Sequence, residues 1–195
     1  MSAKQTEEPR DRPNSIGMVE LTSIAIGMEV EDAMLKAGDV ELMMARTICS
    51  GKFAVMVQGV VSDVEAAVEA GVETSREGLI DHIVIPNVHP AVFPALGQAV
   101  SLDPAKVGAM GVIETFSAAS AVLAGDAAVK AGNVELFRIY LAMAIGGKGY
   151  VQVTGEVSAV QAAVTEGVAA ASKKGLLVAR TVIPRPRMEL FREFV

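Results

Sequence analysis

The pattern of hydrophobic and polar positions describes one unit of structure that occurs twice in the chain. In each copy a short apolar run, at 16–21 and 111–115, predicts a strand. The helical pattern that follows reaches a lysine and then a glycine, Gly38 or Gly132, which predicts the end of a helix. Two strands with alternating apolar residues come next, and then a second helix and a last strand. The order β-α-β-β-α-β predicts an α+β fold of ferredoxin-like topology, in which helices cover one face of an antiparallel sheet.

The two copies match in the same order along the chain. The segment 16–20 returns in similar form at 110–114, a shift of 94 residues, and the segment 36–42 returns at 130–136 with the same shift. Matches that keep their order with small insertions indicate a tandem duplication. The predicted organisation is a flexible tail at 1–14, a first domain at 15–97, a linker at 98–107 and a second domain at 108–195.

The second helix of each unit is predicted to begin with a capping box. In this motif a serine bonds to the backbone of the first turn, and an acidic or amide side chain three residues later bonds back. The two pairs are Ser62 with Glu65 and Ser158 with Gln161.

A sheet with helices on one face leaves its other face bare, so these units are expected to pack against neighbours. Two similar units in one chain present every surface feature twice. Rings close most simply by cyclic symmetry, and three chains would form a ring of six units.

Composition and charge exclude several classes of function. With 17 Lys and Arg against 23 Asp and Glu, the net charge of −6 argues against nucleic acid and anionic membranes as partners. No apolar run reaches the roughly 18 residues of a membrane helix. One cysteine excludes an intrachain disulfide framework, and with two histidines a single chain cannot build a His/Cys metal cage. No nucleophile–base pair, phosphate loop or nucleotide fingerprint is present, so no enzyme is predicted.

Several short motifs carry a resemblance to a known family. Each first helix ends on Asp-Ala-x-x-Lys-Ala, at 32–37 and 126–131, and the last strand ends on Val-Ile-Pro-Arg-Pro at 182–186. Over nearly all of 15–195 the units resemble the bacterial microcompartment shell domain. A closer similarity, to the tandem-domain trimeric shell proteins of propanediol-utilisation compartments, rests on three further segments: 20–25, 47–52 and 145–148.

The resemblance implies a homotrimer that imitates a hexagonal tile and packs edge to edge with other shell proteins. Such a tile belongs to a microcompartment shell within the bacterial cytoplasm, with encapsulated redox enzymes as further partners. The tile-edge lysines and arginine of the family correspond to Lys36, Lys130 and Arg185, and Asn87 stands at the place of Arg185 in the first unit. The turn between the two middle strands lines the central pore in this family, which implies five pore-lining residues here: Cys49, Ser50, Gly51, Gly146 and Gly147.

The single cysteine, Cys49, acquires a role from the same resemblance. At a threefold axis one thiol per chain becomes three, and in the propanediol-utilisation relative this cysteine is a ligand of a [4Fe–4S] cluster. The resemblance implies one cluster per trimer, with three Cys49 ligands and a fourth iron site without a protein cysteine. Electrons, or the cluster itself, would then cross the shell. Ser50 stands where proline is usual.

Other interpretations stay open at this point. A lone cysteine in a reduced protein is also explained as a small buried hydrophobic residue. In that case the tile has an open pore for a small metabolite and no cluster. A soluble α+β trimer that binds a small molecule or acts as an enzyme, unrelated to any shell, is the remaining alternative.

Two duplicated pairs of charged residues allow a functional and a structural interpretation. Lys52 and Lys148 form either a positive pore rim that attracts anions or two solvated turn lysines. Glu20 and Glu114 resemble paired acid and base groups, but duplication places them in equivalent units. A structural hydrogen bond is therefore the expected role of each carboxylate.

The remaining candidate ligands are expected to be structural. His82 and His89 are predicted to lie at the surface or to have satisfied polar contacts, because no partner cluster accompanies them. Met43, Met44 and Met56 are predicted to fill the core rather than to bind a metal.

Overall fold

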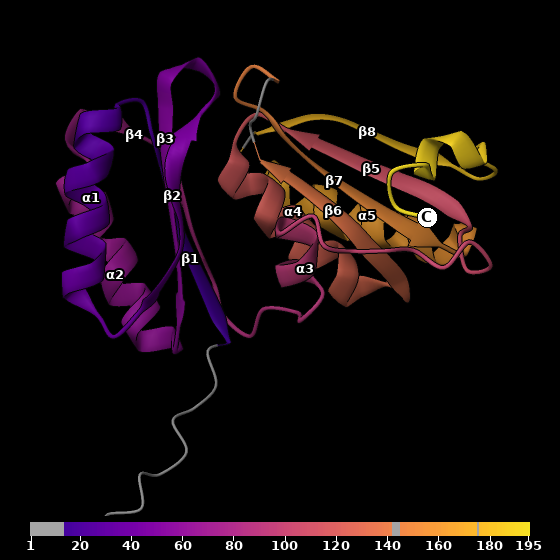
Figure 1. Ribbon diagram of the computed structural model, residues 1–195, viewed down its shortest axis with the longest axis horizontal. Coiled ribbons are helices and arrows are strands. Elements are labelled where there is room, and N and C mark those ends of the chain that lie inside the picture. The colour runs from indigo at the N-terminus through magenta and orange to yellow at the C-terminus, as the bar shows by residue number, and fades with distance from the viewer. Residues whose placement is uncertain (1–13, 142–144, 175) are drawn as a thin grey trace, which may run out of the picture.

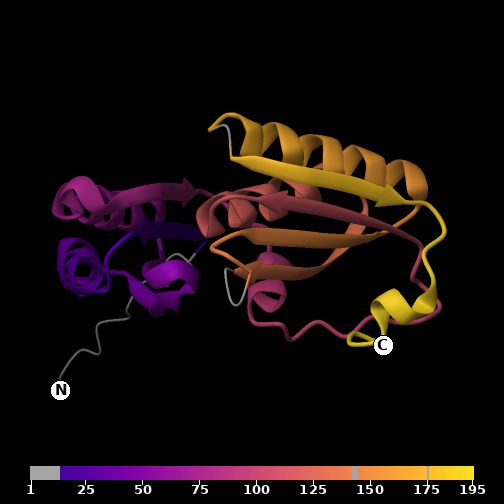
Figure 2. The same ribbon diagram turned by 90° about the horizontal axis from the view of Figure 1, so that it is seen from above.

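Both halves of the chain fold into a four-stranded antiparallel sheet with two helices on one face (Figures 1 and 2). The strand orders are β2-β3-β1-β4 and β6-β7-β5-β8, so the predicted α+β fold and the order of its elements are confirmed. The computed structural model describes residues 14–141, 145–174 and 176–195. The predicted flexible tail lies outside the described residues except for Asn14, which donates a hydrogen bond to Asn87.

The elements of the first domain are β1 (Ser15–Leu21), α1 (Ile24–Ala37), β2 (Glu41–Ile48), β3 (Lys52–Gly59), α2 (Val61–Thr74) and β4 (Leu79–Ile85). A short helix, α3 (Val92–Leu96), follows. The second domain contains β5 (Ala109–Thr115), α4 (Ala118–Ala131), β6 (Val134–Leu141), β7 (Gly149–Gly155), α5 (Val157–Ser172) and β8 (Leu177–Ile183). Short 3-10 turns lie at Cys49–Gly51, Arg76–Gly78 and Met188–Phe191.

The first helix of each domain ends at the predicted glycine. Gly38 and Gly132 are the residues after α1 and α4, but both are extended, with φ of −153° and −141°. Glycine is needed there for space rather than for a left-handed turn. A Cβ atom on Gly38 would lie 2.5 Å from the carbonyl oxygen of Asp63, and one on Gly132 would lie 2.7 Å from that of Ala159.

The predicted capping boxes are wrong. Helix α2 begins at Val61 after Val60, and α5 begins at Val157 after Glu156, with no side-chain cap at either helix. Serine caps occur instead on the first helices, where sequence analysis did not expect them. The Ser23 hydroxyl accepts a hydrogen bond from the Ile26 amide, and the Ser117 hydroxyl accepts one from the Ser120 amide.

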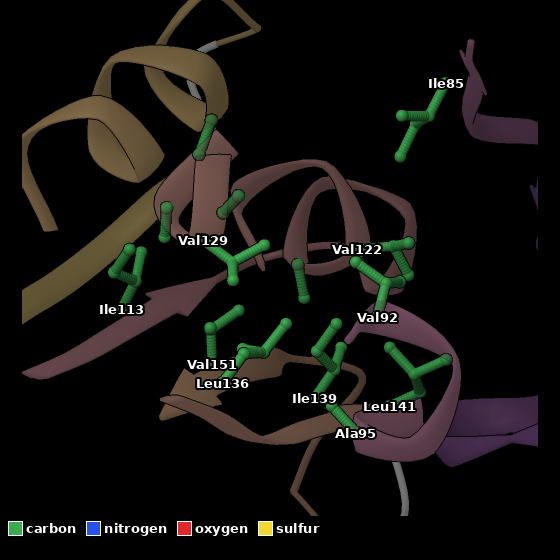
Figure 3. Close-up of a cluster of buried hydrophobic side chains, with 14 of the residues drawn as sticks. Ile85, Val92, Ala95, Ile113, Val122, Val129, Leu136, Ile139, Leu141 and Val151 are labelled. Carbon is green, nitrogen blue, oxygen red and sulfur yellow. The ribbon is translucent and has the colours of Figure 1, made fainter. Parts of the chain in front are cut away.

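Helix α4 lies between the two sheets. On one side it packs against its own sheet, through residues such as Ile139 and Val151. On its other side lie β4 and α3 of the first part of the chain, including Ile85 and Val92 (Figure 3). The face of the first sheet that lacks its own helices is therefore covered by the second domain, and the two domains share a hydrophobic cluster there. The side chains between the first sheet and its own helices form a separate cluster.

Small residues make close packing of helix on sheet feasible. In the first domain the glycine is on the helix, and at the equivalent contact in the second domain it is on the strand. In the first domain a Cβ on Gly27 of α1 would lie 2.4 Å from the ring of Phe53 on β3. At the equivalent place in the second domain, Ala121 of α4 faces Gly149 of β7, where an added Cβ would lie 2.6 Å from the alanine methyl. A large strand residue thus meets a glycine on the helix, and a glycine on the strand meets an alanine.

The chain crosses from the first sheet to the second through α3, which packs against β6 and α4 (Figure 1). The predicted linker then runs along the second domain, where Leu102 is buried with Phe137 and Phe191. Met56 is buried and Met43 and Met44 pack against the core, as predicted. None of the helices in the described ranges has the length and apolar character needed to cross a membrane.

Candidate functional site

The turn between β2 and β3 presents Cys49 near the surface. Residues Cys49–Gly51 form one 3-10 turn in which Ser50 and Gly51 have left-handed backbones, with φ of 64° and 74°. The Cys49 side chain is half-buried, so the cysteine is not a core residue. Proline is restricted to φ near −65°, so the serine permits a turn that proline at this position excludes.

The equivalent turn of the second domain lies against the first one. Gly146 and Gly147 also have positive φ, of 67° and 82°. A Cβ atom on Gly147 would lie 3.1 Å from Nζ of Lys52, the residue that follows Gly51. The two hairpin ends lie at the same end of the molecule (Figure 1). The structure therefore brings together the two turns to which the five predicted pore-lining residues belong.

The lysines that follow these turns are ion-paired, which neither sequence interpretation anticipated. Nζ of Lys52 lies 3.0 Å from Oε1 of Glu20, and Nζ of Lys148 lies 2.8 Å from Oε1 of Glu114. Because each positive charge is balanced by a neighbouring carboxylate, the lysines contribute less to a positive rim than their number suggests.

Glu20 has the structural role expected for it. The carboxylate is fully buried, and its Oε2 accepts hydrogen bonds from the amides of Ala118 at 2.8 Å and Ala119 at 3.4 Å. These amides open α4, where the helix dipole favours a negative charge. Burial raises the pKa of Glu20 above its ordinary value, although Lys52 and the two amides oppose the shift.

A second buried carboxylate, Asp81, was missed by sequence analysis. It accepts hydrogen bonds from the hydroxyls of Ser117 at 2.5 Å and Ser120 at 2.9 Å, and from Nζ of Lys174 at 2.6 Å. Burial favours a higher pKa, but Lys174 and the two serines outweigh it and hold the pKa of Asp81 below its ordinary value. An acidic residue between the apolar positions of the last strand, next to His82, was the available signal.

The two histidines have the structural roles expected of them. His82 is exposed, and His89 is half-buried with its ring Nδ1 accepting a hydrogen bond from the Ala91 amide. The His89 amide donates to Asp126 across the two domains at 2.8 Å. In the described parts of one chain, no group of three or more His, Cys, Asp and Glu side chains comes together as a metal site.

Comparison with known proteins decides the family. The sequence profile of the BMC domain matches this chain twice, over residues 15–88 and 109–186. The chain belongs to the BMC-domain family. It is 48% identical over 181 residues to the bacterial microcompartment shell protein PduT of Citrobacter freundii, covering 93% of this chain and 97% of PduT. The shell protein EutM of Salmonella typhimurium is 41% identical over 86 residues, which cover 44% of this chain and 88% of EutM.

The fold of this shell protein agrees with a solved relative. The crystal structure of a microcompartments protein from Desulfitobacterium hafniense DCB is similar with a TM-score of 0.81 and 45% identity. The match covers 91% of this chain and 98% of the other. The BMC-domain resemblance is thus confirmed: the protein is a bacterial microcompartment shell protein, and its relatives are structural shell components rather than enzymes.

Two of the three tile-edge candidates of this shell protein lie at the ends of equivalent helices, and the third follows the last strand. Lys36 and Lys130 close α1 and α4, and each pairs with the aspartate one turn earlier, Asp32 at 2.5 Å and Asp126 at 2.6 Å. Arg185 is exposed two residues beyond β8. Their contacts with neighbouring tiles stay a prediction.

Proposed function

We propose that three copies of this shell protein form a pseudohexagonal tile whose central opening holds a [4Fe–4S] cluster through three Cys49 thiolates. The observation that carries this proposal is the placement of Cys49 on a surface turn, half-buried and beside the matching glycine turn of the second domain. In this role the tile passes electrons, or the cluster itself, across the shell. Other shell proteins and encapsulated redox enzymes are its proposed partners.

The two first helices support assembly of several copies. At the shift of 94 residues, Ile24, Met28 and Leu35 of α1 correspond to Ala118, Val122 and Val129 of α4. The α4 residues are buried in a hydrophobic cluster that contains side chains of both domains, whereas the α1 residues are 38%, 59% and 40% exposed. The apolar face of α4 is covered within the chain, but the equivalent face of α1 is not. We infer that a second copy of the chain covers the face of α1. Repeating this contact head to tail closes a ring, and a hexagon of domains contains three chains.

The residues at the turn fit the proposed cluster. Thiolate sulfur is the donor that iron–sulfur clusters take, and the single cysteine of each chain supplies one of three ligands. When bound, the cluster supplies one-electron chemistry. The Ser50 and Gly51 amides follow the ligand directly, and hydrogen bonds from such donors to sulfur tune the reduction potential of a cluster.

A second candidate is a tile with an open pore for a small metabolite and no cluster. The space around the turns favours it, because a Cβ atom on Gly51 or Gly146 would meet nothing within 4 Å in the described structure. Both candidates require the same tile, and they differ in whether Cys49 carries iron.

Anaerobic purification and reconstitution with iron and sulfide separate the two candidates. A brown trimer with about four irons and four sulfides per three chains supports the cluster. Cys49→Ser should lose the iron and the colour while the trimer persists, and Ser50→Ala is the matched control that should keep both. A colourless, iron-free wild-type trimer leaves the open pore, and a monomeric wild type contradicts the tile itself.

A further inference from the structure

The contact that joins the two domains uses a carboxylate to close the amino end of a helix. Glu20 projects from β1 of the first sheet, and one of its oxygens accepts the amides of Ala118 and Ala119 at the start of α4. The other oxygen accepts Nζ of Lys52. This arrangement satisfies helix amides that have no partner within the helix, and it removes them from water.

The second domain presents the same carboxylate without a helix end. Glu114 on β5 is the equivalent of Glu20 on β1. Its Oε1 accepts a hydrogen bond from Nζ of Lys148, as Glu20 accepts one from Lys52. Yet the Glu114 and Lys148 side chains are 34% and 37% exposed, against 0% and 19% for Glu20 and Lys52. Among the described residues, no backbone amide donates to Glu114.

The first domain presents the matching helix end without a carboxylate. Helix α1 begins after the serine cap Ser23, as α4 begins after Ser117. The amides of Ile24 and Ala25 are the equivalents of those that Glu20 accepts, and both residues are exposed. The apolar face of α1 continues from this end, so a partner that covers the face also reaches the amides.

The second domain has the carboxylate of this contact and the first domain has the helix end. We therefore infer that Glu114 of each copy accepts hydrogen bonds from the Ile24 and Ala25 amides at the amino end of α1 in the next copy. The inference rests on the proposed tile and names the polar contact that orients its subunits. It predicts that Glu114 and Lys148 become as buried in the assembly as Glu20 and Lys52 are within one chain.

The contact between copies lacks the second carboxylate of the contact within the chain. Along the final strands Asp81 stands opposite Glu20, but Ala179 stands opposite Glu114. Position 26 of α1, which corresponds to Ser120, is an isoleucine, so one hydroxyl partner is missing as well. The contact between copies therefore depends on one carboxylate. We expect it to be weaker than the contact between the two domains of one chain.

Glu114→Ala and Glu114→Gln test the inference by the concentration at which the assembly dissociates. Loss of a charge-assisted hydrogen bond to a buried helix end should raise the dissociation constant about 10-fold or more per contact. Sedimentation velocity over a dilution series measures this shift. The exposed Glu135 of the same domain provides the control, and Glu135→Ala should leave dissociation unchanged. An unchanged dissociation constant in both Glu114 variants overturns the inference.

A crosslinking experiment tests the same contact by the proximity of the two positions, independently of how much the carboxylate contributes to affinity. In a Cys49→Ser background, Ala25→Cys combined with Glu114→Cys should form disulfides that join chains into linked trimers. Lys36→Cys with Glu114→Cys is the control, because position 36 lies about 16 Å along the helix from position 25 and should not link. Trimers that fail to crosslink in the first pair overturn the inference alone, whereas a monomeric wild type overturns the proposed tile.

Discussion

The carboxylate of Glu20 accepts a hydrogen bond from the amide of Ala118, 98 residues further along the chain. The same carboxylate holds Lys52, the residue that follows the cysteine turn, and Lys52 in turn lies against Gly147 of the second turn. Domain packing and the geometry of the two turns are therefore linked through one buried side chain.

Glu20→Ala should lower the free energy of unfolding by about 3 kcal/mol. The substitution leaves Lys52 without its ion pair and the first amides of α4 buried without an acceptor. Urea unfolding followed by circular dichroism measures the change. The exposed Glu41, which accepts a hydrogen bond from Gln58, is the control, and Glu41→Ala should cost about 0.5 kcal/mol or less. Equal losses in the two variants would contradict a special role for Glu20.

Asp81 should make the free energy of unfolding depend on pH in the acidic range. Its pKa is lower in the folded protein than in the unfolded chain, so the ionised carboxylate stabilises the fold above the unfolded value of 3.8. That stability is lost as pH falls through the lowered pKa. Asp81→Asn should be less stable than wild type near neutral pH, and the difference should shrink toward about pH 3. Urea unfolding at several pH values tests this, and a difference that grows in acid has the wrong sign.

Met28→Asp and Val122→Asp should separate assembly from folding. The two positions are equivalent in the repeat, but Met28 is largely exposed and Val122 is fully buried. Met28→Asp should give a folded monomer with unchanged circular dichroism. Val122→Asp should unfold the chain, because an unpaired charge in the core costs more than about 4 kcal/mol. Sedimentation and circular dichroism together provide the readout, and a stable trimer of Met28→Asp would count against the proposed assembly.

Gly27→Ala should destabilise the first domain by about 1–3 kcal/mol, because the new methyl group overlaps the Phe53 ring. The gain in helix propensity, about 1 kcal/mol, offsets part of this cost. A double-mutant cycle with Phe53→Ala identifies the cause: the phenylalanine substitution should cost about 1 kcal/mol less in the Gly27→Ala background. Additive effects on the midpoint of urea unfolding would show that the ring is not the obstacle.

The cysteine turn and the glycines that end the first helices were predictable from sequence because both depend on local signals. A glycine between two alternating strands indicates a hairpin wherever the strands pack. The capping boxes failed because their signal is not purely local: Ser62 and Ser158 have the right spacing, but the helices begin one residue before them. A cap depends on where the helix begins, and neighbouring elements set that point.

The sequence by itself determined the repeat, the order of elements and the position of Cys49 on a turn, since hydrophobic periodicity and glycine placement act within a few residues. Only the tertiary structure decided which copy of a repeated feature is buried. Glu20 and Glu114, or Val122 and Met28, have similar local sequences but different surroundings. The reason is physical: burial and ion pairing depend on which surface lies opposite, and in this chain that surface comes from residues far away in sequence.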